Sequence, residues 1–515
     1  MRIGTNVAAI VANNALQKSQ NNLSTSIERL SSGYKINGSK DDAAGCAISE
    51  KMRAQIRGLS QAQNNTADGV SVLNTAEGAI TEIQSMLTRL KELSVQAAND
   101  VNSDDEREAI QKEIEQINNE IDRISDQTEF NTQSLINGNL SRRVYSDLQG
   151  VNQLSVSDSY TAGVYGITVT EDARQAIAVG AGSITMSSTA SITEEQAGAI
   201  NINGYKISIS EGDTLDKVMG KIIDGVNITG GSAFTVKDLN NDTAANGTDY
   251  AGYVPTADYA GSTLVIMTNQ YGSDQKMNIT CDNAELADIL GIPQAATQDG
   301  IYVEGSDVKA EIATGDDGKR IGFADSAILS TKGTVITVTD VNNKEFSMDV
   351  PGNAAGTVFD DSNNDGQSVA GAGTARTISQ EVTDVGTMSI HVGANQDQVI
   401  VIDIPAITTY SLGTEHMNVM TQYTASRAIS TVDEAINKTN KIRSRIGAYE
   451  NRFDHTTNNL EVSSENLTKS LSTMIDTDMS EEMTTYTSET VLTQAATSIL
   501  AQANERPSQV LQLLQ

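Results

Sequence analysis

Apolar and small residues recur every seven positions over about fifty residues near the start of this chain, and this repeat constrains the fold more than any other feature. A second set of such residues falls at the intervening d-like positions, as in a helix that packs against a partner helix. At about 1.5 Å per residue the helix would be roughly 75 Å long, which requires a partner along its length. The repeat consists of Met52, Leu59, Thr66, Leu73, Ile80, Leu87 and Ser94, with Ala62, Ala76, Ile83, Leu90 and Ala97 between them.

Two further sets of regularly spaced apolar residues, here called ladders, predict partner helices for this helix within the same chain. One lies near the other end of the sequence, and the second has the alternating spacing of four and three that is typical of a helix returning along the first. We therefore predict a bundle of antiparallel helices. An ordinary amphipathic bundle would explain each ladder separately but not their length. The first ladder is Val432, Thr439, Ile446, Phe453, Leu460, Leu467 and Met474; the second is Ile110, Ile114, Ile117, Ile121 and Ile124.

The two ends of the chain also read as helices. Residues 6–30 are amphipathic with few charges, and residues 478–515 end in an apolar tail. Such helices are marginal in water when isolated, so we expect them to order only when packed against each other or against a neighbouring subunit. The residues predicted to face this packing are Leu16, Leu23, Ile27, Leu30, Leu500, Val510, Leu511, Leu513 and Leu514.

The composition limits what the chain can do. Trp is absent and aromatic residues make up 4% of the 515 residues, which argues against a large aromatic catalytic core. The formal net charge is −32, and residues 145–423 hold 12 Lys and Arg against 36 Asp and Glu, a balance of −24. This middle region should repel nucleic acids and anionic membranes and lie in solvent.

No stretch has the roughly 20 apolar residues that a membrane helix needs, and the sequence after Met1 lacks the apolar segment of a signal peptide. We expect a cytosolic protein, or one exported by a route that cleaves no signal. Cys46 and Cys281 lie in unrelated contexts without metal-ligand spacing, so we predict free thiols.

The middle of the chain predicts a β-rich fold with short helices. Residues 199–210 alternate around Asn203-Gly204, a hairpin signal, and Asp213-Thr214 caps a helix that follows. With strands near 233–237, 262–268 and 276–280 and a helix at 284–290, this resembles a compact ββαββ insert. A second β region covers 334–350, and a hairpin at 387–404 turns at residues 393–395.

Both ends of the chain resemble bacterial flagellins, the filament subunits of the flagellum. The match covers about 140 residues at the start and 90 at the end, in the family's order and spacing. The motifs at the start are Leu30-Ser31-Ser32-Gly33-Tyr34-Lys35-Ile36-Asn37, Lys40-Asp41-Asp42-Ala43-Ala44-Gly45 and Arg57-Gly58-Leu59; those at the end are Asn451-Arg452-Phe453, Glu465-Asn466-Leu467 and Leu500-Ala501-Gln502-Ala503-Asn504.

The resemblance implies an α + β multidomain protein whose termini form a long helical coiled coil or bundle around an inserted β-rich outer region. It implies a terminal coiled coil of 1–40 with 478–515 and a helical rod of 41–144 with 386–477. Two outer β-rich regions, 145–295 and 296–385, would complete the chain. The implied function is a subunit that polymerises into the extracellular flagellar filament for swimming, after export in an unfolded state by the flagellar type III system.

The resemblance also implies partners. These are other flagellin subunits, an export chaperone, and the cap and junction proteins of the filament. Host Toll-like receptor 5 is a further partner, and the positions matching the family's receptor-binding surface are Arg89, Leu93 and Glu113. A fork of donors, an apolar contact and an acceptor are the mixture expected of an interface hot spot. The same three residues are also expected to make contacts between subunits.

The sequence offers no catalytic constellation. His391, His416 and His455 are scattered, and we expect no enzyme activity, no cofactor and no metal site. Residues 361–366 resemble the opening of a calcium loop, but Ala372 stands where a bidentate Glu is required, which favours a solvated turn.

Two alternatives to a filament subunit stay open. A hook–filament junction protein shares the terminal helices but forms only a short ring. The outer insert could also act as an adhesin or carbohydrate-binding module displayed on the filament, although the aromatic-poor composition gives no obvious platform for stacking sugars.

Overall fold

The structure is a computed structural model. It describes residues 6–157, 160–180, 182–236, 259, 261–292, 300–315, 318–340, 344–352, 354–355, 359–360, 369–370, 375–383 and 385–513. For residues 236, 359–360, 369–370 and 506–513 only the backbone is described. The resemblance to a calcium loop at 361–366 and the side chains of Val510, Leu511, Leu513 and Leu514 therefore lie outside the described part of the structure.

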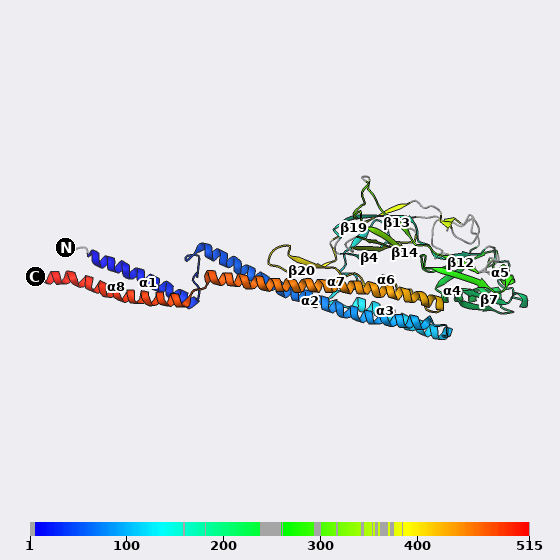
Figure 1. Ribbon diagram of the computed structural model, residues 1–515, viewed down its shortest axis with the longest axis horizontal. Helices are drawn as coiled ribbons and strands as arrows, with labels where there is room; N and C mark the ends of the chain where they lie inside the picture. Colours follow the sequence, from blue (N-terminus) through cyan, green and yellow to red (C-terminus); the bar gives the residue numbers. More distant parts are fainter. Residues whose placement is uncertain are drawn as a thin grey trace. The chain divides into compact units, whose positions relative to one another are not determined.

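Long helices at both ends flank a β-rich middle, which confirms the predicted fold class (Figure 1). The chain divides into two compact units, one of Met1–Val70, Ile390–Ile400 and Asn451–Gln515 and the other of Ser71–Ser389 and Val401–Glu450. The helices are α1 (Val7–Ser32), α2 (Ala43–Ala97), α3 (Asp104–Gln127), α4 (Leu215–Ile228), α5 (Ala284–Ile289), α6 (Thr409–Leu412), α7 (Gln422–Ile475) and α8 (Met479–Leu513).

In the first unit, the early part of α2 packs on the late part of α7. Leu59, Ala62 and Leu460 form a small buried cluster there. Glycines allow close approach on α2, because a Cβ at Gly69 would come within 3.0 Å of the ring of Phe453. The tip of the predicted 387–404 hairpin packs on the same stretch of α2, where the side chain of Asn65 donates to the backbone oxygen of His391 at 3.0 Å.

In the second unit, α2, α3 and α7 lie side by side (Figure 1). Lys91 on α2 contacts Asp433 on α7 at 2.5 Å, while Glu77 pairs with Arg443 at 3.0 Å, so α2 and α7 are antiparallel. The predicted ladders are confirmed as the packed faces of these helices. Side chains with no exposed surface include Leu73, Ile80, Ile83, Leu87, Leu90, Ile114, Ile121, Val432 and Thr439.

Neighbouring strands of the four largest sheets run antiparallel to one another. The four largest sheets have the strand orders β6-β10-β9, β12-β11-β7-β8, β13-β5-β19-β3 and β14-β15-β16-β4. Their strands are β3 (Val144–Ser146), β4 (Asn152–Val156), β5 (Gly163–Glu171), β6 (Ile177–Val179), β7 (Gly198–Ile202), β8 (Tyr205–Ile209), β9 (Gly231–Val236), β10 (Thr263–Thr268), β11 (Lys276–Cys281), β12 (Ile301–Glu304), β13 (Lys309–Ile312), β14 (Ile328–Lys332), β15 (Val335–Thr339), β16 (Glu345–Asp349) and β19 (Arg376–Val382). Short two-stranded pairs are β1 (Glu129–Phe130) with β2 (Gln133–Ser134), β17 (Phe359–Asp360) with β18 (Val369–Ala370), and β20 (Met388–His391) with β21 (Val399–Ile402).

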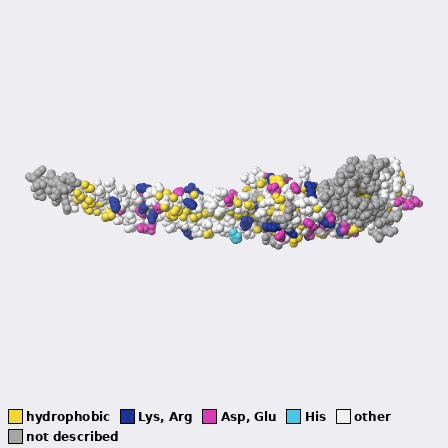
Figure 2. All heavy atoms as spheres, turned by 90° about the horizontal axis from the view of Figure 1, so that it is seen from above, with side chains coloured by type: hydrophobic (Ala, Val, Ile, Leu, Met, Phe, Trp, Pro, Cys, Tyr) yellow, Lys and Arg dark blue, Asp and Glu magenta, His cyan; other side chains and the backbone are white. Residues whose placement is uncertain are grey.

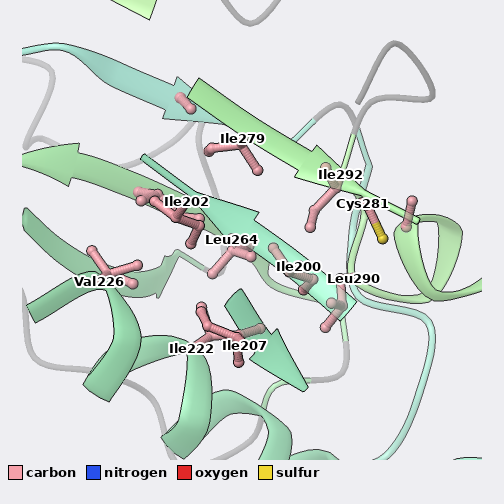
Figure 3. Close-up of a cluster of buried hydrophobic side chains, with 14 of the residues drawn as sticks. Ile200, Ile202, Ile207, Ile222, Val226, Leu264, Ile279, Cys281, Leu290 and Ile292 are labelled. Carbon is pink, nitrogen blue, oxygen red and sulfur yellow. The ribbon is translucent and has the colours of Figure 1, made fainter. Parts of the chain in front are cut away.

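Helix α4 covers the core of the predicted insert. Figure 3 shows Ile222 and Val226 of α4 beside Ile200, Ile207 and Leu264 from the strands. The β7–β8 hairpin has the predicted turn, since Asn203 and Gly204 have φ of 50° and 89°, and Thr214 caps α4 through the backbone N–H of Lys217. The predicted ββαββ order is present, but its strands are divided between two sheets, because β11 pairs with β7 whereas β9 and β10 pair with each other.

The two hydrophobic cores of the middle do not follow the boundary expected near residue 295. One core takes its residues from 176–303. The other joins residues 156–173 to residues 308–382, because β5 lies between β13 and β19. Pairing between strands more than 130 residues apart leaves no local signal in the sequence. The chain order therefore predicted two successive regions. In the structure, the segment that forms one core is instead inserted between the two segments that form the other.

Candidate assembly surface on the terminal helices

Helix α1 has defined start and stop signals. The side chain of Asn6 accepts from the backbone N–H of Ala9, which satisfies a donor that the first turn leaves unpaired. Gly33 ends the helix with φ of 75°, a left-handed conformation that costs glycine little. The helix thus ends within two residues of the predicted boundary at residue 30. The chain beyond Gly33 then runs beside the link between α7 and α8, where Lys35 N donates to Ile475 O at 2.6 Å.

Helices α1 and α8 form an antiparallel pair held by polar contacts along its length. At one end the Asn6 side-chain amide donates to Ala503 O at 2.8 Å. Towards the other end the hydroxyl of Ser26 donates to the buried carboxylate of Glu482 at 2.5 Å, and Arg29 lies 3.6 Å from its second oxygen. The pair is therefore aligned in one register and direction.

The pair buries few of its side chains. Along α1 only Ala12 and Ser26 are buried among the described residues. The predicted packing residues Leu16, Leu23, Leu30 and Leu500 are half-buried, and Ile27 is 49% exposed. The predicted amphipathic face is thus covered only in part by the partner helix, and the remainder has no cover among the described residues.

Several large apolar side chains on this pair remain open to solvent, and they are not among the residues predicted above to face this packing. Figure 2 shows hydrophobic side chains gathered near the free ends of α1 and α8. Leu492 and Ile499 are seven residues apart and therefore share one face of α8. That spacing was the signal available in the sequence. The exposed residues are Val7, Ile10 and Val11 on α1 and Met479, Met483, Val491, Leu492 and Ile499 on α8.

The second predicted site is only partly assembled as expected. Arg89 donates to Glu113 on α3 at 2.8 and 3.0 Å and to Glu92 at 3.1 Å. The pKa of its exposed guanidinium is raised, mainly by the hydrogen bond to Glu113 and to a smaller extent by that to Glu92. Leu93 is 1% exposed, which corrects the expectation that it offers an apolar contact to a partner. It lies on the seam of the bundle because it falls one helical turn from Leu90.

Other side chains of chemical interest are structural. Both thiols are free among the described residues, and burial raises the pKa of the Cys281 thiol, which packs in the core shown in Figure 3. The described residues contain no cluster of three or more His, Cys, Asp or Glu that could hold a metal ion. None of the described helices is both long and apolar enough to span a membrane.

Comparison with known proteins decides the family. Residues 3–141 match the bacterial flagellin N-terminal helical region, and residues 429–514 match the bacterial flagellin C-terminal helical region. Flagellin of Salmonella typhimurium is 31% identical over 99% of this chain and 99% of its own. This chain belongs to the bacterial flagellins. Polar flagellin A of Vibrio parahaemolyticus is 30% identical over 100% of this chain and 99% of its own.

Membership of the flagellins makes this chain a structural subunit of the flagellar filament, an extracellular assembly. Among solved structures, FliC from Burkholderia pseudomallei aligns with a TM-score of 0.22 at 15% identity, over 75% of this chain and 99% of that chain. Flagellar hook associated protein-3 from Legionella pneumophila aligns with a TM-score of 0.28 at 13% identity, over 82% of this chain and 98% of that chain. Both TM-scores are too low for these alignments to contribute to the assignment.

Proposed function

We propose that this flagellin polymerises through the α1–α8 pair, within the terminal coiled coil of 1–40 and 478–515, to build a long filament for swimming. The observation that supports this most is the set of large apolar side chains that the pair leaves exposed. Contiguous apolar surface on a soluble protein marks an interaction site. Neighbouring copies of the same pair carry the same exposed apolar side chains, so contact between copies would complete the packing that one chain leaves open.

The energies favour ordering on assembly. Fully burying an aliphatic side chain contributes about 1.5–3 kcal/mol, and Val491, Leu492 and Ile499 each have half or more of their surface still to bury. Against this stands a cost of about 1–2 kcal/mol per residue for ordering the backbone. With two buried side chains along α1, the isolated pair offsets little of that cost. Subunit contacts would supply the remainder.

The same balance suits export of an unfolded chain. We propose that the flagellar type III system secretes this chain without cleaving a signal, since helices that order only on assembly do not have to be unfolded first. An export chaperone would cover the apolar faces of α1 and α8 before secretion. Cap and junction proteins would then meet those faces at the two ends of the filament.

Seeded growth tests the proposal. Purified monomer is mixed with short filament fragments and imaged by electron microscopy while far-ultraviolet circular dichroism follows helix content. We expect long filaments and a gain in helix. Caps or rings that stop growing would favour the junction protein, and full helicity in the monomer without growth would contradict coupled ordering.

We also propose that the exposed Arg89–Glu113 pair forms part of a surface recognised by Toll-like receptor 5. The support is an ordered guanidinium and carboxylate bridging α2 and α3, a geometry suited to a hot spot. Because Leu93 is buried, its substitution would act through bundle packing. In a receptor reporter assay with monomer, Arg89→Ala should lower signalling at least tenfold. The control Arg123→Ala, which removes an arginine of α3 outside this pair, should not lower it. Equal signalling by both variants would contradict the proposal.

A further inference from the structure

A polar hollow of about 340 Å³ lies in the second unit, where the loop between α2 and α3 meets β8, β11, β12 and the start of α7. Its volume falls within the range of about 300–1,000 Å³ common for small-molecule sites. The chain is poor in aromatic residues, yet the fold brings Tyr205, Tyr302 and Tyr423 to the wall of this one hollow. These tyrosines lie far apart in the sequence, so neither the composition nor a local motif indicated that they meet.

Two of these tyrosines line the hollow and keep solvent-accessible surface. Tyr302 is 52% exposed and its hydroxyl donates to Glu304 at 2.6 Å, which fixes the ring. Tyr423 is half-buried, and the Arg427 guanidinium lies 6.0 Å from its ring centroid without itself lining the hollow. Tyr205 is held differently, because its ring packs against Gly225 of α4.

The positive charges of the hollow are already engaged. Arg107 donates to Ala97 O and to Asn99 O, both at 3.2 Å, where it caps the end of α2. The amine of Lys276 pairs with Glu304 at 2.7 Å and lies 5.7 Å from the Tyr302 ring centroid. An anionic ligand would find no uncommitted cation among these groups, and a cationic ligand at Tyr302 would be repelled by the amine already there.

Two carboxylates remain available as acceptors. The side chains of Asp100 and Asp104 are 85% and 67% exposed. Each forms a long ion pair with the Arg107 guanidinium, at 3.9 and 3.8 Å, which leaves its oxygens able to accept further hydrogen bonds. Carboxylates accept strong hydrogen bonds from hydroxyl groups. The hollow therefore combines partly exposed aromatic side chains with hydroxyl acceptors, and its lining has two carboxylates against two cations.

We propose that this hollow binds an uncharged carbohydrate. A sugar ring presents an apolar C–H face that would stack on Tyr302 and Tyr423, while its hydroxyl groups would donate to Asp100 and Asp104. The filament would then carry a glycan-binding site in every subunit, an activity separate from polymerisation.

Saturation-transfer difference NMR of full-length monomer tests this with maltose, cellobiose and lactose as probes. We expect transfer to the C–H protons of at least one of these sugars. Tyr302→Ala and Tyr423→Ala should each reduce the transfer at least tenfold, Asp104→Asn should reduce it several-fold, and Tyr302→Phe should retain it because the ring remains. Tyr145→Ala, which removes a tyrosine that is 56% exposed on β3, is the matched control and should bind as the unchanged protein does.

Tyr302 is exposed enough for its removal to be tolerated, and circular dichroism verifies that each variant is folded. No transfer to any of the three sugars would overturn the proposal. So would equal transfer in Tyr302→Ala, or binding confined to the anionic sugar sialyllactose. None of these readouts depends on filament growth.

Discussion

The seam between α2, α3 and α7 and the seam between α1 and α8 are built from similar helical repeats, but only the first is completed within the chain. Leu73, Ile80 and Leu87 of α2 have no exposed surface. On α8, Leu492 and Ile499 keep half or more of theirs. An apolar repeat thus indicates that a helix needs a partner, whereas the degree of burial shows whether the chain itself supplies that partner.

The largest expected effect comes from damaging the completed seam. Leu87→Ala removes a fully buried side chain, and such changes cost about 2–5 kcal/mol because a cavity remains. Urea unfolding of the monomer measures this cost. Ile27→Ala on α1 is the comparison variant and should change the free energy of unfolding by less than about 0.5 kcal/mol. Equal losses would mean that α1 is as well packed as α2.

The incomplete seam should show the opposite pattern. Replacing both Leu492 and Ile499 with Ser should leave monomer unfolding nearly unchanged but raise the critical concentration for seeded growth by about tenfold or more. The half-exposed pair has roughly 1.5–3 kcal/mol of burial still to gain, and about 1.4 kcal/mol corresponds to a factor of ten. Exposed polar residues of the same helix, such as Thr485→Ser, provide the control. Normal growth of the double variant would show that these side chains stay uncovered in the filament.

The sequence predicted some parts of the structure better than others, and the reason is physical. Heptad spacing and turn signals act locally, so the central positions of the ladders and the Asn203-Gly204 hairpin are confirmed. The placement of β5 between β13 and β19 depends on pairing between distant strands, which composition does not encode. Leu93 matched a family surface, but only the packed helices show that its side chain is buried.

A smaller effect should follow from the polar contact inside the α1–α8 pair. Glu482→Gln removes the charge that faces Ser26 and Arg29 while keeping the shape of the side chain. Hydrogen bonds to charged groups contribute about 1.5–3 kcal/mol, and glutamine retains part of this through its carbonyl oxygen. We expect faster proteolysis of the terminal helices in the filament, where the pair is ordered, with Glu481→Gln on the exposed side as control. Unchanged proteolysis would show that the contact does not hold the pair in register.

The smallest effect concerns the self-contained core under α4. Lys217, Lys221 and the Ser210 N–H donate to Asp213 and hold the pKa of its carboxyl well below the ordinary value. Because the folded pKa is lower than the unfolded value of about 3.9, this stabilisation is present above that pH and is lost as the pH falls through the folded pKa. Asp213→Asn should therefore lower the thermal midpoint at pH 7 and show a shallower decline on acidification. Parallel acid curves for the two proteins would contradict this assignment.

Hydrogen–deuterium exchange of monomer and filament tests the central difference between the two seams most directly. We predict that amides of α2 around Ile80–Leu87 are protected in both states, whereas amides of α1 and α8 exchange rapidly in the monomer and become protected in the filament. Equal protection of α1 and α8 in monomer and filament would contradict the account, because it would mean that the chain alone already completes both seams.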